Sequence, residues 1–429
     1  MTDLAIVLRS LRARTFSTAV TAVTVAIATA LLLTLLSLRQ AGSSAFLRGS
    51  GNAHLLVSAD AGPLVSVLNA IFYANAPQRA IPFAKFNQIR ESFPWAWAIP
   101  MQQGDSFRGF PTLATSPQFF SKFEPAVGEP WRFAEGRAFD KNFEAVLGSA
   151  VARDTGLRVG AELAFTHGSG DEHGHVHDEF AFTVVGILEP TGSAHDRAIF
   201  CDLDSSWVLH AHDRRERDGL VKHEHTHGGP PATTVADLID DDRRITGILL
   251  RLPTREGSSV PAALQQQFDV LRRDPTITVA NPADQIGKLL SIIGRVDLLF
   301  VALAVVILVS SVISILVALY NSMRERRRQV AIFRVLGASK GRVMALVLTE
   351  SALIGLLGGA GGILLATFGT AVAASYLKHE VGLVLGFAVD PRSAVIVLAL
   401  TVLLACLAGI LPASLAYRTP VADELRPTA

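Results

Sequence analysis

Four apolar segments, each long enough to cross a lipid bilayer, constrain this chain more than any other feature of its sequence. A helix rises ~1.5 Å per residue, so about 20 apolar residues are needed to cross the hydrocarbon core. The segments lie at 16–38, 296–320, 343–376 and 392–416. We therefore predict a membrane protein with four transmembrane helices, arranged one plus three, and a large domain inserted between helices one and two.

Arginine and lysine near the spans predict their orientation, because basic residues accumulate on the cytoplasmic side. Basic residues occur in the N-terminal segment 1–15 and the tail 417–429, and seven lie in the segment 321–342, whereas the loop 377–391 has only Lys378. We expect both termini and segment 321–342 to be cytoplasmic, and residues 39–291 to lie outside. The protein would then be a multi-pass protein surrounded by lipid in a bacterial inner membrane.

The inserted segment 39–291 is long enough to bury a core of its own. Short stretches rich in β-branched and aromatic residues predict strands at 144–147, 162–166, 180–188, 197–201, 245–252 and 276–280. Helices are predicted at 83–92, 117–123 and 260–272, and the stretch 61–82 is ambiguous. Strands interleaved with helices in this way indicate an α+β domain outside the membrane.

Histidine is concentrated in two parts of the inserted segment, which read as insertions at 167–179 and 210–229. The first insertion has acidic residues among its histidines, and its place between two predicted strands is typical of a loop that carries an added function. The candidate metal ligands are His167, His173, His175, His177, His195, His210, His212, His223, His225 and His227.

Imidazole is a good ligand for zinc, copper and nickel, and carboxylates can complete a coordination shell. Histidine-rich tracts are therefore metal-binding candidates by composition, with zinc or another divalent metal as the ion. Two alternatives remain open. The tracts are solvated loops that bind metal only weakly, or they respond to pH, since free histidine titrates near pH 6.5.

The third span contains glycines at a spacing that lets helices approach closely. Gly355 and Gly359, and likewise Gly358 and Gly362, lie four residues apart. They predict either packing within the chain or a subunit contact. Glu350 lies near the start of the same span. It is a functional candidate, as acids in spans generally are, or a carboxylate stabilised by the positive end of the helix dipole.

Several classes of protein are excluded or disfavoured. The chain has no G-x-x-x-x-G-K-[ST], H-E-x-x-H or G-x-S-x-G motif, so we expect no enzyme activity and no bound ATP. A net charge of +1 gives no reason to expect nucleic acid as a partner. Cys201 and Cys406 are the only cysteines, which excludes a disulfide framework.

The whole arrangement resembles the FtsX/MacB/LolC-type permeases of ABC transporters, which combine a MacB-like periplasmic domain with an FtsX-like transmembrane domain. The most specific part is QVAIFRVLGAS at 329–339, with arginines before it and Glu350 and glycines after it. The stretches 135–163, 182–200 and 412–427 are also similar. Gln329, where the family often has glutamate, and the histidine-rich insertions depart from the family pattern.

The resemblance implies that a separate ABC ATPase binds the ATP and that the permease is a homodimer or a heterodimer with a relative. The family's coupling segment corresponds here to Arg328, Val330, Ile332, Phe333, Leu336 and Gly337. Its apolar residues also predict a short amphipathic helix ending at Gly337 that fits a groove in a partner. The preceding arginines are equally explained by the preference of basic residues for the cytoplasmic side.

The leading hypothesis is a permease subunit that couples ATP hydrolysis to export or extracytoplasmic handling of a substrate. That substrate would be connected with zinc or a similar metal, for example as a metal complex, a lipoprotein, a peptide or a metal-loaded accessory protein. One alternative is a non-transporting mechanotransmitter that activates an extracytoplasmic enzyme or assembly. Another is a membrane-anchored metal sensor or buffer in which ATP has no part.

Overall fold

The computed structural model describes residues 3–167, 179–221, 233–255, 261–335, 338–380 and 389–418. It divides into two compact units. The membrane unit contains residues 1–41, 293–376 and 386–429, and the inserted domain contains residues 42–292 together with 377–385.

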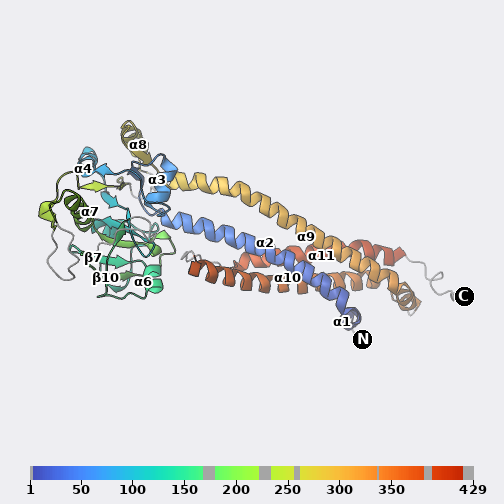
Figure 1. Cartoon of the computed structure of the whole chain (residues 1–429). Helices are drawn as coiled ribbons and strands as arrows, with labels where there is room; N and C mark the ends of the chain where they lie inside the picture. Colours follow the sequence, from blue (N-terminus) through green and yellow to red (C-terminus); the bar gives the residue numbers. More distant parts are fainter. Residues whose placement is uncertain are drawn as a thin grey trace. The chain divides into compact units, whose positions relative to one another are not determined.

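Five helices belong wholly or partly to the membrane unit, and Figure 1 labels them. They are α1 (Asp3–Ala13), α2 (Thr15–Gly49), α9 (Pro282–Val335), α10 (Lys340–Glu380) and α11 (Pro391–Arg418). Within the described residues, four stretches are long and apolar enough to cross a membrane: Thr15–Ala41, Val301–Asn321, Gly341–Tyr376 and Pro391–Ser414. The predicted one-plus-three arrangement around an inserted domain of helices and strands is confirmed.

Helix α9 is much longer than its span and includes most of the segment expected to be a loop. It has 54 residues and continues through the arginines to Val335. Arginine, glutamate and glutamine are good helix formers, and the sequence from Val301 to Gly337 contains no proline and no other glycine. The coupling segment therefore extends α9, and the separate short helix that the sequence suggested is not formed.

The inserted domain is built on a mixed sheet of 12 strands with the order β14-β1-β13-β3-β5-β11-β7-β10-β6 along its main path. Strand β4 pairs with β5 and β9, and β8 pairs with β10. Neighbouring strands are antiparallel except for the parallel pairs β10–β7 and β11–β5. The strands are β1 (Leu55–Ser58), β3 (Trp97–Gln102), β4 (Asp105–Phe107), β5 (Phe110–Thr115), β6 (Phe133–Gly136), β7 (Glu144–Leu147), β8 (Glu162–Leu163), β9 (Thr166–His167), β10 (Phe182–Leu188), β11 (Ile199–Asp202), β13 (Gly247–Arg251) and β14 (Thr278–Ala280).

Both faces of this sheet are buried, since alternate residues of a strand point to opposite faces. In β1, Leu55 and Val57 belong to one apolar cluster while Leu56 belongs to a second. Helices cover the sheet: α3 (Pro63–Ala70), α4 (Phe83–Ser92), α5 (Gln118–Lys122), α6 (Ser149–Thr155), α7 (Leu203–Arg217) and α8 (Leu264–Arg272). A small second sheet pairs β2 (Ile81–Pro82) with β12 (Arg244–Ile245).

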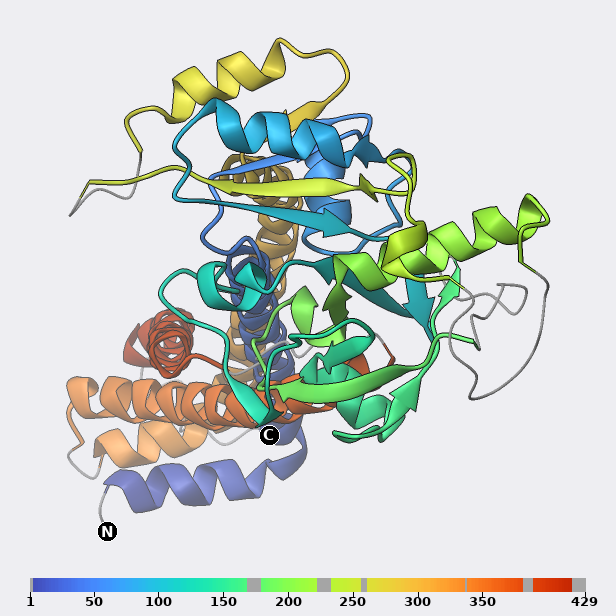
Figure 2. The same cartoon turned by 90° about the vertical axis from the view of Figure 1, so that its left-hand side faces the viewer.

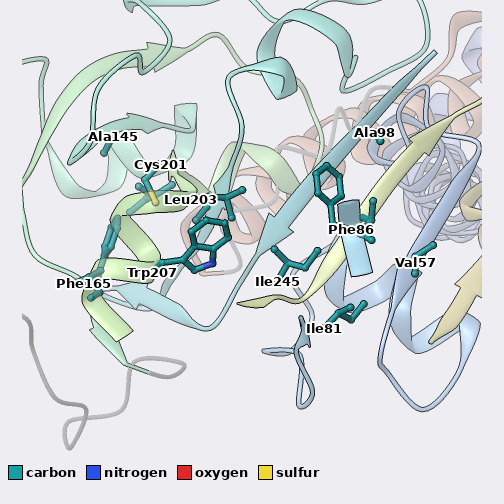
Figure 3. Packing of buried hydrophobic residues seen from close by; sticks show 14 of the residues in the cluster. Val57, Ile81, Phe86, Ala98, Ala145, Phe165, Cys201, Leu203, Trp207 and Ile245 are labelled. Atoms are coloured by element: carbon teal, nitrogen blue, oxygen red, sulfur yellow. The ribbon is translucent and has the colours of Figure 1, made fainter. Parts of the chain in front are cut away.

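The first cluster joins α4, α7 and α8 to one face of the sheet. Phe86 of α4, Trp207 of α7 and Leu271 of α8 all belong to it. Figure 2 shows α4 and α8 on the same side of β3 and β13, and Figure 3 shows Trp207, Leu203 and Phe86 packed beside the strands. The second cluster lies on the other face and contains Phe119 and Phe123 together with Ile286 from the first turns of α9.

The structure also shows where the sequence was misleading. Strand β7 and helix α4 have the predicted bounds, whereas β3 and β5 near the middle of the sheet were not predicted. Both contain a proline, Pro100 or Pro111, which argues against a central strand because proline donates no hydrogen bond. Helix α7 was missed as well: residues 210–217, assigned to the second histidine-rich insertion, are its last two turns.

Candidate functional site

The described coupling residues lie on the last turns of α9. Arg328, Val330, Ile332 and Phe333 belong to this helix, while Leu336 and Gly337 lie outside the described residues. The next helix, α10, begins at Lys340, and the backbone N–H of Arg342 donates to Ser339 Oγ at 3.2 Å. Ser339 thereby caps a helix end whose amides would otherwise lack partners.

Helix α2 enters the inserted domain through a closely packed junction. Asn52 Nδ2 donates to the Lys122 carbonyl at 3.1 Å, and Asn52 Oδ1 accepts from the Glu124 amide at 3.1 Å. Gly51 has a φ of +61°, and a Cβ there would lie 2.3 Å from the Phe123 ring. Only glycine meets both the conformational and the steric requirement.

Helix α9 begins in the same apolar cluster. The Gln285 amide donates to the Asn281 carbonyl at 3.1 Å, which starts the helix directly after β14. Ile286 is 1% exposed and belongs to the cluster that contains Phe123. The domain ends of α2 and α9 are therefore packed into one cluster of the inserted domain.

The four candidate packing glycines all contact neighbouring spans of the same chain. A Cβ at Gly358 would lie 2.6 Å from Val25, and one at Gly362 would lie 2.5 Å from Thr29, both on α2. A Cβ at Gly355 would lie 2.6 Å from Ala405, and one at Gly359 would lie 2.5 Å from Leu398, both on α11. Real Cβ atoms do not come this close, so these contacts depend on the absence of a side chain.

Glu350 is not at the start of its helix. Helix α10 begins at Lys340, so Glu350 is well beyond the first turn, where the helix dipole acts. Its side chain is 9% exposed, and Oε1 accepts a hydrogen bond of 3.0 Å from Ser10 Oγ on α1. The dipole explanation for Glu350 is therefore wrong.

The described ends of the two histidine tracts meet at one place, the C-terminal half of α7. We call the residues involved, Asp105, Glu179, His210, His212 and Thr233, the histidine base. His212 Nε2 lies 3.1 Å from Glu179 Oε2, and His212 Nδ1 lies 3.0 Å from Thr233 Oγ1. His210 Nε2 lies 3.7 Å from Asp105 Oδ2.

The histidine base places three tract ends together. Asp105 is paired with His167 through strands β4 and β9, at the start of the first tract. Glu179 is the last residue of that tract, and Thr233 lies four residues after the second tract. The two tracts are distant in the sequence, yet their described ends are held by one turn of one helix.

An ion pair fixes the chain that follows the second tract. Arg214 of α7 makes two hydrogen bonds of 2.8 Å to Asp242, through Nε and Nη2. Burial is the largest single influence on Asp242 and raises its pKa, but the hydrogen bonds from Arg214 and the Ile239 amide, together with the charge of Arg214, lower the pKa by more in total, so that the net pKa is lowered. The carboxylate therefore stays charged and holds residues 233–244 against α7.

The described part of the histidine base does not form a complete metal site. His210 and His212 are two residues apart on a helix, so their side chains diverge. No three histidine, cysteine, aspartate or glutamate residues in the described ranges are placed to hold one ion. His173, His175, His177, His223, His225 and His227 lie outside those ranges, and only the backbone of His167 is described.

His195 has a different environment from the other candidate ligands. It is 2% exposed, and its Nδ1 lies 2.8 Å from the Tyr73 hydroxyl. Besides Tyr73, its ring contacts four further aromatic residues with centroids 5.5–6.4 Å away: Phe119, Phe123, Trp131 and Phe200. Burial lowers its pKa to about 4, although the Gly49 backbone favours the protonated form. These surroundings favour a neutral, structural imidazole in the cluster that receives α2.

A groove of about 590 Å³ lies beside α4 and α7 on the other face of the sheet. Aromatic side chains line it, among them Phe83 and Trp207, and so do the charged residues Arg90, Arg243 and Asp204. A surface with both apolar and charged groups is suited to an amphipathic, peptide-like ligand.

Sequence reasoning missed Asp105, Thr233 and the contact between Ser10 and Glu350. Asp105 and Thr233 lie far from the tracts or follow them without any distinctive motif, and only the fold brings them to α7. Ser10 precedes Glu350 by 340 positions. A single sequence contains no signal for such a pair.

Comparison with known proteins identifies two matching regions. Residues 18–266 match the MacB-like periplasmic core domain, and residues 301–421 match the FtsX-like permease C-terminal domain. An uncharacterized ABC transporter permease of Methanocaldococcus jannaschii is 27% identical over 137 residues, which are 31% of this chain and 34% of that protein. The chain thus spans about a third of the length of this relative.

Among solved structures, the extracellular domain of the noncanonic ABC-type transporter YknZ from Gram-positive bacteria matches 48% of this chain and 96% of its own. The sequence identity is 6% and the TM-score is 0.25, which is too low to support a conclusion about the fold.

Proposed function

Because this chain belongs to the family of ABC transporter permeases with a MacB-like periplasmic core domain and an FtsX-like C-terminal domain, we propose that it couples a separate ATPase to the inserted domain. In this proposal the ATPase binds the segment 321–342 in the cytoplasm, and the inserted domain lies on the other side of the membrane. ATP-driven movement of the segment is transmitted through the helices. The domain then exports or handles a substrate outside the membrane.

The observation that supports this proposal is the continuity of α9. Its 54 residues, Pro282–Val335, belong to one uninterrupted helix. One end contains Phe333, and the other contains Ile286 in the core of the inserted domain. A continuous helix transmits displacement along its axis better than a chain with a flexible break.

We expect Phe333→Asp, alone or with Leu336→Asp, to abolish co-purification with the ATPase encoded for this system. A buried charge at an apolar contact loses its hydration without gaining a partner, which disrupts binding. The measurement is affinity capture of the ATPase on the tagged permease in detergent. Leu220→Asp is the matched control, since Leu220 is an exposed apolar residue of the inserted domain and should tolerate the change. Undiminished capture by the Phe333 variant would contradict the proposed coupling segment.

The meeting of the tract ends at the histidine base favours a second element of the proposal, a link to zinc or a similar divalent metal. Two tracts whose described ends lie at one place could supply ligands to one ion, whereas two tracts with distant ends could not. Glu179 and His212 add oxygen and nitrogen groups at this place. The substrate would then be a metal complex or a molecule that carries the metal.

We expect the full-length protein to bind zinc with micromolar or tighter affinity and to lose most of this binding when residues 168–178 are deleted. Isothermal titration calorimetry in detergent measures both. Deletion of residues 256–260, a segment without histidine, is the control and should leave binding unchanged. Binding only at millimolar zinc would indicate that the tracts are solvated loops.

A further inference from the structure

Helix α1 connects the coupling segment to the first span in a way that the proposed function does not include. The coupling segment is continuous in sequence with α9 and α10 only. Helix α2 also leads to the inserted domain, but it is not adjacent in the sequence to the coupling segment. The helix that precedes α2 in the sequence is α1, and only Arg14 lies between the two helices.

Two polar contacts join α1 to the first turns of α10, and they are in register. Asp3 Oδ1 accepts from Arg342 Nη2 at 2.6 Å and from Nε at 3.1 Å. Ser10 Oγ donates to Glu350 Oε1 at 3.0 Å. The contacts are seven residues apart on α1 and eight on α10, which corresponds to about 11 Å and 12 Å of helix. The two helices therefore run side by side in the same direction.

Apolar packing fills the space between these contacts. Val7 and Leu11 of α1 are 2% and 8% exposed. They belong to a cluster that also contains Ile315 of α9 and Ile354 of α10. The same cluster contains Val25 of α2 and Ala405 of α11, so α1 packs in a cluster to which all four spanning helices contribute, among them the two that the coupling segment joins.

The contacts differ in strength. The pair of Asp3 and Arg342 is about half exposed on each side, and such surface pairs contribute little. The hydrogen bond from Ser10 to Glu350 is partly buried, which makes it more costly to break. Glu350 has a defined partner on α1, as an acid within a span requires.

We propose that α1 is a lever that passes movement of the coupling segment to α2, and that the Ser10–Glu350 hydrogen bond is its joint. Movement of the first turns of α10 would shift α1 through Glu350, and α1 would shift α2 through the short link at Arg14. The inserted domain would then receive movement through α2 as well as α9. This inference rests on the proposed coupling function, and Ser10 and Glu350 are positioning residues in it.

Spin-label distances in the complex with the ATPase test the lever directly. One label pair joins α2 and α11, at Leu38→Cys and Val395→Cys, and another joins α9 and α11, at Leu303→Cys and Val395→Cys; all three sites are exposed. The background is Cys406→Ala, since Cys201 is buried and unreactive. We expect both distances to change with ATP in this background. In Glu350→Ala and Ser10→Ala, the α2 distance change should be at least halved while the α9 change persists.

Two further variants distinguish the loss of the Ser10–Glu350 hydrogen bond from a general destabilisation of the protein. Glu350→Gln retains an oxygen that accepts from Ser10 and should restore most of the α2 movement. Ser17→Ala removes an exposed hydroxyl from α2 and should have no effect. Undiminished α2 movement in the Ser10 and Glu350 variants, or an equal loss at α9, would overturn the lever. If neither distance responds to ATP in the unmodified background although the ATPase is bound, the coupling function itself fails.

Discussion

Replacement of Gly362 by leucine is expected to prevent α2 and α10 from packing and to destabilise the membrane unit by about 3 kcal/mol. A Cβ at this position would lie 2.5 Å from Thr29 Cβ and 2.7 Å from the Ala26 carbonyl. Thr29 Cβ is fixed to the backbone of α2 and the Ala26 carbonyl is part of that backbone, so neither atom can move away unless α2 itself shifts. The helices must therefore separate along their whole contact, and the loss should appear as a lower midpoint of thermal unfolding in detergent.

The same helix supplies a control for this substitution. A Cβ added at Gly369 would have no atom within 4 Å, so Gly369→Leu should change stability by less than about 0.5 kcal/mol. Thr29→Ala removes only the contact with Thr29 Cγ2 and should restore little of the stability of Gly362→Leu, because Thr29 Cβ and the Ala26 carbonyl both remain. Equal stability of the Gly362 and Gly369 variants would show that the observed α2–α10 contact does not form in solution.

Replacement of His195 by alanine is expected to destabilise the inserted domain by about 3 kcal/mol. The change opens a cavity among Phe119, Phe123, Trp131 and Phe200, and it leaves the buried Tyr73 hydroxyl without its partner. Replacing both partners, as in Tyr73→Phe with His195→Phe, keeps an aromatic ring at each position, leaves no cavity and removes both polar groups. This double variant should lose clearly less stability in denaturant unfolding than His195→Ala.

The pH dependence of stability distinguishes a neutral buried imidazole from a simple packing residue. In the unfolded chain the imidazole takes up a proton near pH 6.5, whereas in the folded domain it stays neutral until about pH 4. Between these values the unfolded state binds more protons, so stability falls as the pH is lowered, by about 1.4 kcal/mol per pH unit.

His54 has a similarly lowered pKa, first through burial and then through Arg251, but it is only half buried and its effect is reduced by solvent. The double variant Tyr73→Phe with His195→Phe should therefore lose the larger part of the slope between pH 6.5 and 4. A slope identical to that of the unmodified protein would contradict a neutral buried His195. Above pH 6.5 the two proteins should show the same, flat dependence.

The parts of the fold that the sequence predicted are those governed by local pattern. Four spans follow from the length of apolar runs, and β7 and α4 follow from alternation and flanking turn residues. The parts that it did not predict depend on contacts over long distances in the chain. Pro100 and Pro111 lie in strands only because the sheet does not require their missing amides, and no local rule states this.

The candidate site shows the same division. The coupling segment was recognisable because its residues are contiguous, and the glycines because their spacing has a meaning in membranes. The continuation of α9 to Val335 is harder to predict, because Gly337 is typical of the end of a short separate helix while the arginines before it favour one continuous helix. The histidines were conspicuous by composition, but their common base at α7 and the distinct environment of His195 arise only when the sheet is assembled.

The distribution of tryptophan has a practical consequence. All four tryptophans, Trp95, Trp97, Trp131 and Trp207, belong to the inserted domain, and three of them are less than 9% exposed. Tryptophan fluorescence therefore reports the unfolding of this domain alone and does not report on the membrane-spanning helices. Far-ultraviolet circular dichroism, dominated by those helices, reports on the remainder. Comparing the two signals in one sample would show whether the halves of the molecule unfold together or one after the other.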